Sequence, residues 1–161
     1  IGDALAVACM RARRFGKLDF KKFHPSGSLS TKLKTVEDLM ISGKKLPIIN
    51  ENKIMKKALY IINLKKLGLI IVTNNKGNTV GIITDGDIKR ATQKNKDIKD
   101  LKVKKIMSKK PFTVDKDVLA AQALSIMNDK KITSLCVHNN KKKNRSIGII
   151  HIHNILEANI T

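Results

Sequence analysis

The spacing of hydrophobic residues along this chain predicts a compact unit of alternating strands and helices. Apolar residues recur at helical spacing over residues 54–64, and two apolar runs of strand length follow at 69–72 and 80–83, separated by an Asn-Asn-Lys-Gly turn. An extended segment at 47–49 precedes this group, and a helix from about residue 85 to 92 follows it. The pattern therefore predicts a β-α-β-β-α unit.

The same order of elements is predicted a second time in the C-terminal half of the chain. An extended segment at 112–114 leads into a helical pattern at 118–128. Strands at 135–137 and 147–150 and a helix at 152–158 complete the second unit.

Individual residues in the two units also correspond. Gly81 and Gly148 are 67 residues apart, whereas Val72 and Val137 in the preceding strands are 65 apart. A repeat of this length is a small domain rather than a solenoid repeat, and a duplicated unit usually stacks on its copy and leaves related clefts between them. We therefore expect an α+β fold in which two β-α-β-β-α units pack about a pseudo two-fold axis.

The chain is expected to divide into a leading segment and two domains. Residues 36–95 form the first predicted domain and residues 103–161 the second, while residues 1–35 contain an amphipathic helix followed by a loop. Because the chain begins at Ile1 without an initiator Met, we expect it to be a fragment, an expression product or the remnant of an interrupted reading frame.

Composition favours a folded protein of the cytoplasm. A chain of 161 residues with 42% hydrophobic residues can bury a core, and it contains neither an apolar run long enough to cross a bilayer nor a visible signal peptide. Cys9 and Cys136 have no partner at metal-ligand spacing, so we expect two reduced, buried thiols and no metal site.

The net charge of +20 raises the question of a nucleic-acid or membrane partner. Of the 33 basic residues 28 are Lys, and together with abundant Ile and Asn they match what AT-rich codons encode. Aromatic residues make up only 3% of the chain, too few for a single-strand binding platform. We expect solvated lysines and neither a nucleic-acid nor a membrane partner, although a phosphate-bearing ligand would meet a favourable field.

One polar motif stands on a predicted strand-to-helix turn, where Gly81-Ile-Ile is followed by Thr84, Asp85, Gly86 and Asp87. A hydroxyl at a helix start with a carboxylate three residues later is a capping box, which needs no ligand. A helix start also attracts phosphate, and here Thr84 could donate to a phosphate oxygen while Asp87 accepts ribose hydroxyls. The two interpretations are compatible, and both remain open from the residues alone.

The corresponding motif of the second unit has different polar residues. Gly148-Ile-Ile is followed by His151, Ile152, His153 and Asn154, and the Asn lacks the charge that Asp87 offers. Either this cleft binds another group, with both His residues facing a phosphate or a carboxylate, or it is vestigial. Surface positions without any ligand also account for two His residues at this spacing.

The motif Gly-apolar-apolar-Thr-x-x-Asp at the end of a repeated β-α-β-β-α unit resembles the cystathionine-β-synthase (CBS) domain pair. That family binds adenosyl or other nucleotide ligands in its clefts, which implies a ligand site at Thr84, Asp85 and Asp87. The strand lead-ins around Leu69 and Ser134 are implied to contribute to it. The resemblance implies that His151, His153 and Asn154 occupy the second cleft.

Two upstream segments are similar to the junction between the domains of bacterial arabinose-5-phosphate isomerases. These are GDALAVA at residues 2–8 and FHPSGSLSTKL at 23–33. The resemblance implies a sugar isomerase for ribulose 5-phosphate and arabinose 5-phosphate, which serves the synthesis of Kdo for lipopolysaccharide and needs no cofactor for catalysis. His24 matches the catalytic His of the family. Other catalytic residues would precede Ile1, so the chain alone is not expected to turn over substrate.

The same resemblance implies a regulatory role for the two units. The expected ligand is an adenosyl nucleotide or CMP-Kdo, and the expected assembly is a homo-oligomer, a dimer of CBS pairs that forms a tetramer in the intact enzyme. The alternative is an oligomerisation scaffold whose clefts stay empty. This alternative is kept open because symmetric self-association is common.

Overall fold

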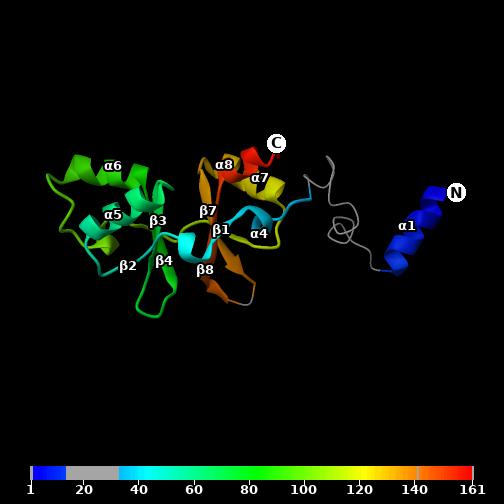
Figure 1. The fold of residues 1–161 in the computed structure, drawn as a ribbon, viewed down its shortest axis with the longest axis horizontal. Coiled ribbons are helices and arrows are strands. Elements are labelled where there is room, and N and C mark those ends of the chain that lie inside the picture. Colours follow the sequence, from blue (N-terminus) through cyan, green and yellow to red (C-terminus); the bar gives the residue numbers. More distant parts are fainter. Residues whose placement is uncertain (1, 14–32, 141, 161) are drawn as a thin grey trace.

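The computed structural model describes residues 2–13, 33–140 and 142–160 and shows two four-stranded sheets, each accompanied by helices (Figure 1). Helix α1 spans Gly2–Ala12. The first sheet has the strand order β2-β3-β4-β5 and the second has the order β1-β8-β7-β6. The expected α+β fold of two related units is confirmed.

The first unit has the predicted order of elements. They are β2 (Ile48–Asn50), α5 (Met55–Lys65), β3 (Leu69–Thr73), β4 (Thr79–Thr84) and α6 (Asp85–Lys94). Strands β2 and β3 are parallel because α5 returns the chain between them, whereas the short turn joins β3 and β4 as an antiparallel hairpin.

The second unit repeats this order. Its elements are β6 (Thr113–Asp115), α7 (Ala120–Lys130), β7 (Ser134–Asn139), β8 (Lys142–His151) and α8 (Ile152–Glu157). As in the first unit, the parallel pair is β6 with β7 and the antiparallel pair is β7 with β8.

Each unit takes its fourth strand from the segment that precedes the other unit. Strand β1 (Ile41–Ser42) precedes the first unit but pairs with β8 of the second sheet. Strand β5 (Ser108–Lys109) precedes the second unit but pairs with β4 of the first sheet. Sequence periodicity did not indicate this exchange, because two-residue strands carry no pattern of their own.

Each hydrophobic core, like each sheet, includes a residue from the segment that precedes the other unit. Val103, in the 3₁₀ helix η2 (Val103–Lys105), is fully buried in the core of the first unit, with Met55, Ala58, Ile70 and Ile83. Val36, in the short helix α4 (Val36–Leu39), is fully buried in the core of the second unit, with Val114, Met127, Leu135 and Ile150. Neither core is therefore contiguous in sequence.

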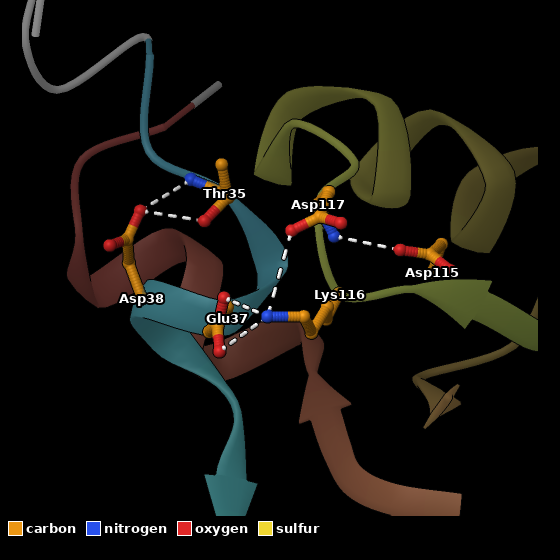
Figure 2. A network of polar contacts seen from close by, with 6 residues as sticks. All are labelled: Thr35, Glu37, Asp38, Asp115, Lys116 and Asp117. Atoms are coloured by element: carbon orange, nitrogen blue, oxygen red, sulfur yellow. Dashed lines mark hydrogen bonds and ion pairs between the residues drawn. The ribbon is translucent and has the colours of Figure 1, made fainter. Parts of the chain in front are cut away.

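Polar contacts also fasten α4 to the second unit (Figure 2). The ammonium of Lys116 donates to both carboxylate oxygens of Glu37, at 2.9 and 2.8 Å, and this hydrogen bonding raises the pKa of Lys116. At the start of α4, Thr35 donates through its backbone N–H and its hydroxyl to Oδ2 of Asp38, at 2.7 and 2.8 Å. This capping box has the same Thr-x-x-Asp spacing as Thr84 and Asp87.

A third apolar cluster lies between the two sheets. It contains Leu69 and Ile71 from the first unit and Cys136 and Ile149 from the second. Beside it, the hydroxyl of Thr79 contacts that of Ser146 at 2.9 Å, and these residues are themselves 67 positions apart. Equivalent positions thus meet each other, as an approximate two-fold relation requires.

The two cysteines lie in different surroundings. Burial raises the pKa of the Cys136 thiol to about 11, so this side chain behaves as a small core residue at neutral pH. Cys9 on α1 is exposed, and the expectation of two buried thiols is wrong for that residue.

Candidate functional site

A cavity of about 550 Å³ lies where the first unit meets the second, and we call it the inter-unit cavity. Four parts of the chain line it: residues 67–69 at the start of β3, the end of β4 with the start of α6, the segment 108–112 that contains β5, and the segment 131–134 with His151. The strand exchange creates this site, because β5 brings residues from before the second unit to the edge of the first sheet.

Asp87 occupies the centre of a hydrogen-bond network at one side of this cavity. Its Oδ2 accepts from the backbone N–H and the hydroxyl of Thr84, both at 2.8 Å. Its Oδ1 accepts from Nη2 of Arg90 and from the hydroxyl of Ser108, both at 2.7 Å. The carboxylate is only 6% exposed, so the capping-box interpretation holds and both oxygens are already engaged.

These contacts determine the charge state of Asp87. Burial by itself would raise its pKa, but the hydrogen bonds from Ser108, Thr84 and Arg90 outweigh burial and lower the pKa below the ordinary value of 3.8. The ionised carboxylate therefore stabilises the fold above pH 3.8, and this contribution is lost as the pH falls through the lowered pKa.

Asp85 lines the same cavity but has a different environment. Its side chain is exposed and lies over Gly68, where an added Cβ would come within 2.8 Å of Oδ2. Gly68 has a φ of +63°, and its carbonyl accepts from the backbone N–H of Asp85 at 3.1 Å. No hydrogen bond or ion pair of the Asp85 carboxylate occurs among the described residues, so this acceptor is open to a ligand.

Positive charge surrounds these two carboxylates. The cavity is lined by Arg90 from α6, Lys109 from β5, Lys110 directly after β5, and Lys131 after α7. Apolar side chains complete its wall, including Leu69, Ile132 and a half-exposed Phe112. The site thus combines an apolar surface, a free acceptor and several cations, which suits a flat, anionic organic molecule.

The side chains that surround Asp87 are replaced by others in the second unit. At an offset of 67 residues, the second unit has His151 at the position of Thr84, Asn154 at that of Asp87 and Glu157 at that of Arg90. Ser108 is replaced by Ile41, and the pairing of Ile41 with Ile149 matches that of Ser108 with Ile82. The second unit therefore has an acidic residue, Glu157, where the first unit has the basic Arg90.

His151 belongs to the inter-unit cavity as well as to the start of α8. Its Nδ1 accepts from the backbone N–H of His153 at 3.3 Å, and the two rings stack with centroids 4.9 Å apart. Burial and, second, the charge of His153 lower the pKa of His151 below 6.5. The side-chain oxygen of Asn154 accepts from the backbone N–H of His151 at 3.2 Å, as in a capping box.

The structure brings together most of the residues predicted from the sequence. The inter-unit cavity is lined by Leu69, Thr84, Asp85, Asp87, Ser134 and His151. His153 and Asn154 do not line it, and His24 lies outside the described residues. Their roles in binding or catalysis, like those of the lining residues, stay predictions.

Sequence reasoning did not single out Arg90, Ser108 and Thr133, nor the three lysines of this cavity, Lys109, Lys110 and Lys131. Arg90 carried a usable signal, since a residue three positions after Asp87 on a helix lies on the same face. The others are distant in sequence and reach the cavity only through tertiary structure.

Fold and site together define a module of two repeated α+β units with a cavity at their junction. The CBS domain profile matches residues 35–94 and residues 103–160. The chain belongs to the CBS domain family.

Proteins with similar sequences include isomerases. The chain is 37% identical over 161 residues to arabinose 5-phosphate isomerase KdsD of Pseudomonas aeruginosa, a match that covers 99% of this chain and 49% of that protein. It is 34% identical to KdsD of Yersinia pestis, with 99% and 48% covered, and 34% identical to uncharacterized protein RP505 of Rickettsia prowazekii, with 100% and 49% covered. The chain spans about half the length of these curated relatives.

Solved CBS structures share the fold. CBSX2 in complex with AMP has a TM-score of 0.66 at 23% identity, covering 78% of this chain and 95% of that one. The CBS domain pair of MJ0100, in complex with 5′-methylthioadenosine and S-adenosyl-L-methionine, has a TM-score of 0.68 at 22% identity, covering 78% and 94%. At this level of identity the likeness concerns the fold alone.

Within the described ranges, every helix is too short or too polar to cross a membrane.

Proposed function

We propose that this chain is a regulatory module that binds an adenosyl nucleotide in the inter-unit cavity. The observation that carries the proposal is the pairing of a free carboxylate with an apolar wall and a ring of cations. Asp85 would accept the ribose hydroxyls, while the base would lie on Leu69, Ile132 and the exposed ring of Phe112. The cavity volume of about 550 Å³ lies in the range of small-molecule sites.

Asp87 has a positioning role in this proposal. Because both of its oxygens are engaged, it would hold Arg90 and Ser108 in place rather than meet the ribose directly. Direct contact of Thr84 or Asp87 with a nucleotide would require one of these hydrogen bonds to be exchanged. A phosphate would instead meet Arg90 and the lysines of the cavity.

The charge of the cavity favours anionic nucleotides. CBSX2 was solved with AMP, and the MJ0100 domain pair with S-adenosyl-L-methionine, which carries a sulfonium cation. Four cationic residues against two carboxylates make AMP the better match for this chain. CMP-Kdo, which also bears a phosphate, is the competing ligand within the same class of anionic nucleotides.

Titration calorimetry with AMP, S-adenosyl-L-methionine and CMP-Kdo tests the proposal. We expect saturable AMP binding with a Kd below about 1 mM. S-adenosyl-L-methionine should bind more weakly than AMP. Absence of saturable binding for all three compounds in the millimolar range would contradict ligand sensing by this chain.

We further propose that the module regulates an arabinose 5-phosphate isomerase. Support comes from KdsD relatives about twice as long as this chain, to which nearly all of it aligns. Nucleotide binding would change catalysis by favouring one arrangement of the assembly. In an intact isomerase that carries this module, AMP should change the isomerisation rate, and an Asp85→Asn variant should remove that change while keeping the basal rate.

A second candidate function is self-association. Tyr60 and Leu64 lie one turn apart on α5 and are 68% and 62% exposed, which leaves an apolar face on this helix without a partner in the monomer. Sedimentation of wild type and of a Tyr60→Ser/Leu64→Ser variant tests this role. A wild-type dimer that the variant converts to monomer, with no nucleotide binding by either, would favour the scaffold.

A further inference from the structure

A second cavity of about 480 Å³ borders α6 and shares three residues with the inter-unit cavity: Asp87, Arg90 and Ser108. We call it the α6 cavity. Its remaining wall comes from the later turns of α6 and from η2 with the residues beside it. The two cavities are therefore adjacent, with Arg90 in the wall of both.

The polar lining of the α6 cavity is mainly cationic. Arg90 and Lys94 lie one turn apart on α6, and Lys105 enters from η2. Among the described residues, neither Lys94 nor Lys105 has an acidic partner. The only carboxylate in the lining is Asp87, which already accepts four hydrogen bonds.

Arg90 is positioned to serve both cavities. Its Nη2 donates to Oδ1 of Asp87 at 2.7 Å, which fixes the side chain, while its exposure leaves the other guanidinium N–H groups for a ligand. A guanidinium has five donors in a planar fork and binds phosphate oxygens in pairs. Lysines add less directional positive charge.

The second unit shows that this cluster is specific to one site. The positions 67 residues from Arg90 and Lys105 are occupied by Glu157 and Asp38. The cluster of cations at the α6 cavity is therefore not explained by the high lysine content of the chain alone. At the equivalent place in the second unit, the acidic residues would repel an anion.

We propose that the α6 cavity binds the distal phosphate groups of a nucleotide whose base and ribose occupy the inter-unit cavity. The inference rests on the proposed nucleotide binding and narrows the ligand to a nucleoside diphosphate or triphosphate. Lys94 and Lys105 hold the distal phosphates, and Arg90 contacts the phosphate that bridges the two cavities.

Calorimetry with AMP and ADP, on the full chain and two variants, tests the proposal. The first variant, Lys94→Gln/Lys105→Gln, removes two charges from the α6 cavity. The control variant, Lys56→Gln/Lys76→Gln, removes two charges from exposed residues that line neither cavity. We expect wild type and control to bind ADP about fivefold to tenfold more tightly than AMP, a preference that the first variant loses while keeping its affinity for AMP.

Three results would overturn the inference. The first is equal affinity of the wild type for AMP and ADP. The second is an equal loss of AMP and ADP affinity in the Lys94→Gln/Lys105→Gln variant, since such a loss would reflect only the general electrostatic field of the protein. Inorganic phosphate that binds at Lys94 and Lys105 while the ADP preference is absent would assign the cavity to a separate phosphate compound. Failure of AMP itself to bind contradicts the proposed function instead, so the two claims can be told apart.

Discussion

Asp85 and Asp87 are two residues apart at the start of one helix, yet their environments differ. Asp87 is buried and accepts four hydrogen bonds, whereas Asp85 is exposed and lines the inter-unit cavity. The first carboxylate stabilises the helix end and orients its neighbours, and the second is available to a ligand. The motif itself could not distinguish these roles, because both residues are the same type of acid.

Substitution at these two positions should separate stability from binding. Asp87→Asn weakens the charge-assisted bonds to Arg90 and Ser108, so we expect the free energy of unfolding to fall by about 1–2 kcal/mol. Asp85→Asn changes an exposed residue and should alter the free energy of unfolding by less than about 0.5 kcal/mol. Urea unfolding of both variants measures the difference, and equal losses would contradict the assignment.

His151 should make stability depend on pH near neutrality. Its pKa in the folded protein is lowered from 6.5 by burial and by His153, so the unfolded chain binds the proton more readily. Stability is therefore full above pH 6.5 and decreases as the pH falls towards the lowered value. Protonation also removes the Nδ1 acceptor that caps α8.

A His151→Thr variant, which installs the residue found at position 84, tests this dependence. Thermal or urea unfolding from about pH 7.5 to about pH 5.5 should show a smaller loss of stability for the variant than for wild type. If both proteins lose stability equally, His151 is not the group responsible.

At the scale of elements, the exchanged strands require close contact with a glycine on each sheet. A Cβ at Gly81 would lie 2.8 Å from the carbonyl oxygen of Ser108 in β5 and 2.7 Å from Sδ of Met107. At Gly148, the equivalent contacts are 3.1 Å to the carbonyl of Ile41 in β1 and 2.5 Å to Sδ of Met40. The repeat of these glycines at matching positions therefore has a structural cause.

Gly81→Ala should destabilise the protein by about 1–3 kcal/mol, because the backbone of β5 must move to admit the methyl group. Gly86→Ala is the matched control. Gly86 lies in α6, where the nearest atom to an added Cβ is the flexible Arg90 side chain at 3.4 Å, so alanine should be neutral or stabilising. A Gly81→Ala variant as stable as this control would contradict close packing of the exchanged strand.

The longer elements were predictable because each carries its own hydrophobic period. Helix α5 and strands β3 and β4 begin and end within one or two residues of the predicted bounds. Strands β1 and β5 were not predictable, since their position depends on pairing with distant residues. The exchange is a tertiary property that a linear reading of the repeats does not contain.

The residues of the candidate site were likewise predictable only where they are local in sequence. Thr84, Asp85 and Asp87 were found because they are contiguous with a turn that the pattern identifies. Ser108 was missed because β5 delivers it from outside the first unit. His153 was included for its chemistry, but of the two stacked rings only that of His151 lines the cavity.

At the scale of the whole molecule, the sequence repeats and the folding units need not have the same boundaries. The predicted domain at residues 36–95 lacks Val103 and β5, both of which belong to the first sheet and its core. It contains Val36, which is buried in the other core. The segment 46–110 instead holds every element of the first sheet together with η2.

Two fragments test which boundaries describe a folding unit. The fragment 46–110 should show a cooperative urea transition followed by circular dichroism, and the fragment 36–95 should show none. The reason is that only the first completes its core with Val103. Cooperative unfolding of 36–95 alone would support the sequence boundaries and contradict the importance of the exchange.

The two units form an unequal pair, and the central claim is that one nucleotide binds per chain in the inter-unit cavity. Calorimetric titration of AMP into wild type and Asp85→Asn tests this claim most directly. We predict a single site per wild-type chain with a Kd below about 1 mM and an affinity at least about tenfold lower in the variant. Two equivalent sites per chain, or equal affinity in both proteins, would contradict the account.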